Sequence, residues 1–112
     1  MAILSADYSN LDYEEMAKAI GLKPKHIPML IASFIEEAQP ILTTLESSIE
    51  VKDYTNLASS SHAIKGSAGN LRLNEVYEMA KEMEFSAKAN EVDFDYKAHL
   101  EAVKTILETL QV

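Results

Sequence analysis

The sequence predicts an all-α protein, an antiparallel four-helix bundle with a short additional N-terminal helix. Apolar residues recur at steps of three and four along most of the chain, and no segment alternates convincingly as a strand does. The connections between the long amphipathic segments are short, which favours antiparallel neighbours in a bundle. A chain of 112 residues is long enough for one core, so we expect a single domain over residues 1–112.

The N-terminal part predicts a short helix followed by a long one. The short helix is expected over residues 10–20, with Ser9 or Asn10 as its cap and Gly21 as its stop. Pro24 should then open the long helix, because proline is favoured in a first turn.

The long second helix carries an apolar stripe of more than six turns, which indicates a core-facing bundle helix. Pro40 lies within the stripe and should kink the helix without ending it, because the pattern continues in phase. The apolar positions are Ile27, Leu30, Ile31, Phe34, Ile35, Ala38, Ile41, Leu42, Leu45 and Ile49.

Three further helices complete the predicted bundle. Asp53 is expected to cap the third helix, which ends at about Ala68 or Gly69, where the Gly69-Asn70 pair marks a turn. A fourth helix is expected over residues 73–89, and Asp93 should cap a fifth over residues 94–110.

Composition limits the function classes. No apolar run approaches the ~20 residues that span a membrane, and the N-terminus lacks the basic and apolar regions of a secretory signal. The absence of cysteine excludes disulfides and thiolate zinc sites. We therefore expect a cytoplasmic protein. A net charge of −8 argues against nucleic-acid and membrane partners, and it fits either a protein partner with a basic face or simple solubility.

The segment around His62 is the most informative for function. Two of the three glycines, Gly66 and Gly69, fall within a predicted helix, where a glycine costs about 1 kcal/mol relative to alanine. Gly66 lies one turn after His62, and Ser59 lies one turn before it, so the imidazole is cleared of bulk on both sides. The helical period places His62 away from most inward positions, where a large partner can reach it.

Glu84 interrupts the apolar face of the fourth predicted helix. A carboxylate at such a position costs several kcal/mol unless it has a partner. Either the edge of the stripe is solvated there, or Glu84 accepts a hydrogen bond from one nitrogen of His62. Such a bond would fix the tautomer and leave the other nitrogen as a nucleophile.

Few other catalytic elements accompany this histidine. Three dispersed glycines cannot build a Walker or kinase loop, and nothing suggests a Mg²⁺ site or an oxyanion hole. His26 and His99 lack a second ligand at helical spacing, so we expect no metal site and place both at the surface or its boundary. What remains is a passive nucleophile that receives a group from another protein, with Lys65 offsetting the charge of a phosphoryl group.

At this point the chain resembles a known family, the histidine-containing phosphotransfer (HPt) domains of two-component phosphorelays. The match is H-x-x-K-G-S-A-G-N-L at residues 62–71, followed by a helix that contains the Met83-Glu84 pair. A stretch F-I-E-E-A-x-P at residues 34–40 adds to it, and the resemblance covers essentially the whole chain in helix order.

The resemblance implies a role for each residue of the motif. His62 is the phosphorylated residue and Lys65 assists the phosphoryl group. Glu84 occupies a position where many members carry glutamine and the chemotaxis kinase type carries glutamate. Access to the histidine is expected to depend on the small residues Gly66, Ser59 and Gly69.

The resemblance also implies carriage of a phosphoryl group without independent catalysis. The partners are response-regulator receiver domains and a sensor or hybrid histidine kinase. The receiver supplies the Mg²⁺, so the chain needs no cofactor of its own. We expect a monomer that docks through small and apolar surface of the second and third helices. Candidates for the border of that surface, although their spacing fits a core better, are Ile31, Phe34 and Ile35.

Two other functions are open. A module that keeps the fold but carries no phosphate would dock on a kinase or response regulator and regulate it, but the intact His62, Lys65 and Gly66 argue against this. A small helical enzyme with His62 and Glu84 as a general-base pair would need a substrate pocket or a metal that the sequence does not reveal.

Overall fold

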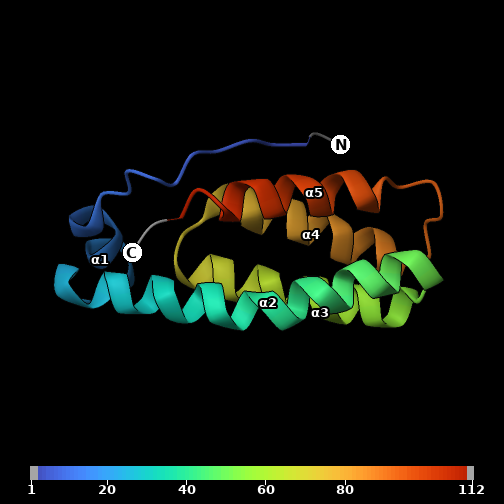
Figure 1. The fold of residues 1–112 in the computed structure, drawn as a ribbon, viewed down its shortest axis with the longest axis horizontal. Coiled ribbons are helices and arrows are strands. Elements are labelled where there is room, and N and C mark those ends of the chain that lie inside the picture. The colour runs from blue at the N-terminus through green and yellow to red at the C-terminus, as the bar shows by residue number, and fades with distance from the viewer. Residues whose placement is uncertain (1–2, 111–112) are drawn as a thin grey trace.

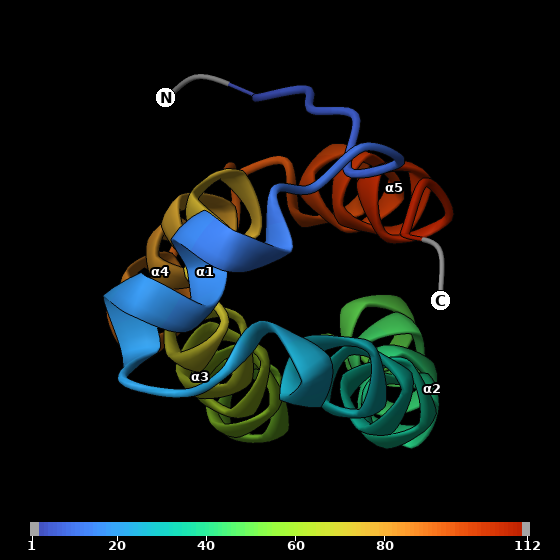
Figure 2. The ribbon, with the colours of Figure 1, turned by 90° about the vertical axis from the view of Figure 1, so that its left-hand side faces the viewer.

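The computed structural model describes residues 3–110, in which five α-helices and one short 3-10 helix follow one another without a strand. Contacts join α2 to α3, α3 to α4, α4 to α5 and α5 back to α2, which closes a four-helix bundle. Consecutive bundle helices run in opposite directions (Figure 1), and α1 lies across one end of the bundle (Figure 2). The predicted all-α class is confirmed. The elements are α1 (Tyr13–Ile20), η1 (Pro24–His26), α2 (Ile27–Val51), α3 (Tyr54–Asn70), α4 (Asn74–Lys88) and α5 (Tyr96–Leu107).

Aspartate side chains define the starts of three helices. Asp12, Asp53 and Asp95 each accept a hydrogen bond from the backbone N–H three residues further on, which satisfies one of the free donors of a first turn. The cap at Asp53 was predicted. The predicted starts of α1 and α5 were wrong, because both helices begin later, after aspartates that make the capping bond. The residues wrongly expected to cap are Ser9, Asn10 and Asp93.

Left-handed residues mark four of the turns, and those at Gly21 and Arg72 bear on the predicted helix ends. Gly21 ends α1 with a φ of 74°, as predicted, and its N–H donates to the carbonyl of Ala17. The turn between α3 and α4 lies later than predicted, because α3 continues through Asn70 and the reversal occurs around Arg72, whose φ is 59°. The Arg72 guanidinium stabilises this turn by donating to the carbonyl of Gly69 at 2.9 Å.

Helix α2 confirms the long apolar stripe. Pro24 opens the short η1 turn, and α2 follows directly and continues past Pro40 for 25 residues in all. A kink at Pro40 stays a prediction. The positions of the stripe alternate between fully and half-buried, because only the middle of the stripe faces the bundle axis. Its buried members are Ile27, Ile31, Phe34, Ala38, Leu42 and Leu45.

His99 is buried, contrary to the predicted surface or boundary position. Only 3% of the residue is exposed, and its ring lies 4.5 Å from the ring of Phe94. Nδ1 lies 2.9 Å from the carbonyl oxygen of Asp95, and Nε2 lies 3.2 Å from Oε2 of Glu82. Burial is tolerated because both ring nitrogens have polar partners.

The N-terminal segment is tied across the bundle by Tyr8, which the sequence did not reveal. Its hydroxyl donates to Oε1 of Glu75 at 2.7 Å, and its backbone N–H donates to Oγ1 of Thr109 at 2.8 Å. Tyr8 therefore connects the chain before α1 to the start of α4 and to the residues just after α5.

The two glycines of α3 should differ in how stability changes when each is replaced by alanine. A Cβ at Gly66 meets no atom within 4 Å, whereas a Cβ at Gly69 would lie 3.1 Å from Cδ1 of Tyr77. Gly66→Ala should raise the free energy of unfolding by about 0.5–1 kcal/mol through helix propensity alone. Gly69→Ala should gain less or lose stability. Urea unfolding of both variants checks this, and a larger gain for Gly69→Ala would contradict it.

Candidate functional site

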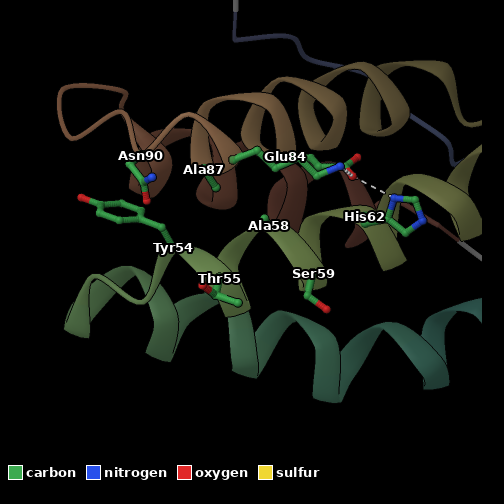
Figure 3. Close-up of a pocket in the computed structure, with 9 residues that line it drawn as sticks. Tyr54, Thr55, Ala58, Ser59, His62, Glu84, Ala87 and Asn90 are labelled. Atoms are coloured by element: carbon green, nitrogen blue, oxygen red, sulfur yellow. Dashed lines mark hydrogen bonds and ion pairs between the residues drawn. The ribbon is translucent and has the colours of Figure 1, made fainter.

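The site lies where the middle of α3 faces the C-terminal half of α4. Nδ1 of His62 is 2.9 Å from Oε2 of Glu84, so the hydrogen-bonded arrangement is present and the solvated-edge alternative is excluded. The two partners differ sharply in exposure, since 67% of the His62 side chain is accessible and only 5% of the Glu84 side chain is. Figure 3 shows the imidazole at the edge of α3 with the carboxylate reaching it from α4.

Three donors converge on the Glu84 carboxylate. Besides His62, Nζ of Lys65 lies 2.6 Å from Oε1 and Nζ of Lys88 lies 2.9 Å from Oε2. Burial alone would raise the pKa of Glu84, but the hydrogen bonds from Lys65, Lys88 and His62 outweigh it and lower the pKa to about 2. The same hydrogen bond to Glu84 raises the pKa of Lys65 above its usual value. The carboxylate is therefore ionised at neutral pH.

An ionised carboxylate fixes the tautomer of His62. Because it can only accept hydrogen bonds, Nδ1 must carry the hydrogen, and in the neutral ring Nε2 then holds a lone pair. Nε2 is turned away from Glu84 (Figure 3) and belongs to a largely exposed side chain. The arrangement can present one nucleophilic nitrogen to a partner. The imidazole is held in place by the buried Glu84 carboxylate, whose charge is balanced by the two lysines.

The predicted access residues divide into two kinds. Gly66 and Ser59 are exposed on the face of α3 that carries His62, and nothing crowds the position of a Cβ at Gly66. Gly69 is different, because its Cα faces the ring of Tyr77 on α4. The expected access role is wrong for Gly69, whose missing side chain allows the two helices to approach closely.

The predicted docking residues are mostly part of the core. Ile31 and Phe34 are 0% and 3% exposed, so the prediction that they border a docking surface is wrong for both. Their helical spacing points both side chains toward the bundle axis. This is the core position, which the sequence pattern fitted better than a docking surface. Ile35 is half-buried and packs against the core.

Sequence reasoning missed Lys88. Lys88 follows Glu84 by four residues, which is the spacing of a favourable Glu-Lys pair on a helix, and this signal could have identified it. Two thirds of its side chain is accessible, so the ammonium group can contact both the carboxylate and a bound partner.

Neither a metal centre nor a membrane span is found in the part of the chain that the structure describes. Across residues 3–110, no cluster of three or more histidine, aspartate and glutamate side chains is arranged to hold a metal ion. No helix in this range has the length and apolar character needed to cross a bilayer.

The fold and site together define a helical-bundle domain of the histidine phosphotransfer class. The family model for the Hpt domain matches residues 29–111, which include α2 from Met29 onward, α3 to α5 and all the residues around Glu84, so the chain belongs to the Hpt domain family. Hpt domains serve phosphotransfer in two-component signalling, where they interact with receiver domains and kinases and act as phosphocarriers rather than autonomous enzymes. No curated protein and no solved structure matches the chain.

The Glu84 charge should stabilise the fold in a pH-dependent way. Its pKa falls from the usual 4.5 to about 2 on folding, so its contribution is complete above about pH 4.5 and is lost as the pH falls toward 2. At pH 7, Glu84→Gln should lower the free energy of unfolding by roughly 2–3 kcal/mol. Urea unfolding of both proteins between pH 7 and pH 2 should show the difference shrinking below about pH 4.5. A difference that does not depend on pH would contradict this account.

Proposed function

We propose that Nε2 of His62 accepts a phosphoryl group from the aspartyl phosphate of a receiver domain, or from a histidine kinase, and passes it to another receiver aspartate. One observation carries the proposal: the buried Glu84 carboxylate binds Nδ1 at 2.9 Å and leaves the exposed Nε2 as the nucleophile. The site offers no competing nucleophile with an ordered base beside it.

The transfer step follows from this tautomer. The Nε2 lone pair attacks phosphorus in line, the N–P bond forms, and the P–O bond to the aspartate breaks as the carboxylate leaves. The hydrogen on Nδ1 stays donated to Glu84, which stabilises the positive charge that develops on the ring. The reverse step delivers the group to another aspartate. The receiver contributes the Mg²⁺, and this chain contributes no cofactor.

The two lysines support binding of a phosphoryl group. Lys65 and Lys88 share the Glu84 carboxylate with His62. Each ammonium group has three donors, so contact with the carboxylate leaves others for phosphoryl oxygens. The chain as a whole has a charge of −8, so these cations are a local exception beside the nucleophile.

Helix α3 is suited to close approach of a receiver domain. Within its 17 residues Lys65 is the only residue with a permanent charge, and the exposed face around His62 carries small side chains. On α3 itself, a partner therefore meets few bulky or charged side chains on the way to Nε2. We propose that this transfer takes place in the cytoplasm.

Replacement of the histidine tests the proposed carrier function. Phosphoryl label from a phosphorylated receiver domain should move to the wild type in an acid-labile, alkali-stable form, and His62→Gln should accept none. His26→Gln is the matched control, because His26 lies in η1 outside the site, and it should be labelled like the wild type. Label on His62→Gln would disprove the proposal. Binding of receivers without labelling of the wild type would favour a docking module.

Replacement of Lys88, which the sequence analysis did not identify, tests the part of this residue in phosphoryl transfer. Lys88→Ala removes one of three donors to Glu84 and a cation near His62, so transfer from the receiver should slow by about tenfold, the scale of a charged hydrogen bond. Lys97→Ala on α5 is the control, because that exposed lysine lies on another helix. Rapid-quench measurement of labelled His62 gives both rates, and equal rates would show that Lys88 takes no part.

A further inference from the structure

A groove extends from His62 along the junction of α3 and α4, toward the start of α3. Its volume is about 550 Å³, and one side is open to solvent. Ala58 and Ala87 form an apolar floor, since both are buried, and Tyr54 and Asn90 stand at the end opposite to His62 (Figure 3). The groove exists because small residues face each other where two packed helices would otherwise fill the space.

The groove is larger than the chemistry at His62 requires. Thr55 lies seven residues before His62 on the same helix, which places it about 10 Å from the histidine along the helix axis. Thr55 and Ser59 line the α3 side of the groove, and both residues are exposed. A phosphoryl group bound at Nε2 cannot reach the Thr55 end, so that end is available for another part of an incoming molecule.

The lining indicates the chemistry of the occupant. The floor is apolar, the α3 side is lined by the uncharged residues Thr55 and Ser59, and Lys88 supplies a positive charge close to His62. A small molecule would be left largely exposed in an open-sided groove, whereas small-molecule sites bury most of their ligand. A protein loop with a small apolar side chain for the floor and an anion at the Lys88 end fits both the shape and the charge.

We propose that this groove is a second docking element for the receiver domain, which seats the loop beside its phosphorylated aspartate between α3 and α4. The inference rests on the proposed function and adds a specificity site to it. The loop places an apolar side chain over Ala58 and Ala87, while the aspartyl phosphate reaches Nε2 next to Lys88. Thr55 and Ser59 then select among receivers by the size and polarity of that loop.

Filling the groove at its far end tests this inference. Thr55→Trp places a large ring two turns from His62, and Thr55→Gln is a second variant with a long, flexible side chain at the same position in case the first is poorly folded. Thr105→Trp on α5 is the matched control, because it is also an exposed helical threonine. Each protein is labelled by two donors: a phosphorylated receiver domain, and phosphoramidate, whose P–N bond breaks as ammonia leaves and the bond to Nε2 forms.

The two donors separate docking from reactivity at His62. Thr55→Trp should slow transfer from the receiver by about tenfold or more, as loss of a well-packed contact does, and leave labelling by phosphoramidate within about twofold of the wild type. Equal transfer from the receiver to Thr55→Trp and Thr105→Trp would overturn the inference, as would parallel loss with both donors. Failure of the wild type to accept label from either donor would instead refute the proposed function, and the inference with it.

Discussion

The Glu84 carboxylate is the interaction on which the rest of the site depends. It is a buried anion on the apolar side of α4, and it is tolerated only because two lysines and a histidine donate to it. Two of those donors come from α3 and one from α4, so the same contacts that compensate the charge also fix how the two helices face each other. Removing the negative charge would leave the lysines without a partner and the imidazole free to rotate. Orientation of the nucleophile and local packing are therefore two results of one set of contacts.

Helix α3 shows how a reactive face is kept accessible within a stable bundle. It has little charge, two glycines and many small residues, so its own helix propensity is modest. Its buried side compensates: Leu57, Ile64 and Ala68 lie in the core, and Gly69 allows Tyr77 to pack closely. Gly66 has no such structural role, because no atom lies where its side chain would be. Stability and access thus depend on different residues of the same helix.

The sequence predicted the features that rest on periodicity and on local chemistry. The bundle, the Asp53 cap, the Gly21 stop and the outward position of His62 all follow from spacing within one helix. The errors concern competition and contact between segments. Asp12 and Asp95 prevailed over nearby caps because their carboxylates reach the free N–H groups of the first turn. Burial of His99 depends on partners from two helices, and the groove beside His62 depends on small residues that face each other across α3 and α4. Neither can be read from one helix alone.

The distribution of charge connects this geometry with selection of a partner. A chain of net charge −8 repels nucleic acids and other anions at long range, although screening at physiological salt limits that repulsion to about 8 Å. Around the carboxylate that holds His62 the local charge is different, because Lys65 and Lys88 together exceed the charge of Glu84 by one. An anionic phosphoryl group is therefore attracted only after a partner has docked closely enough to bring it there. Docking must be driven by shape and by neutral surface, which is what α3 and the groove provide, and the charges then act on the phosphoryl group at the point of transfer.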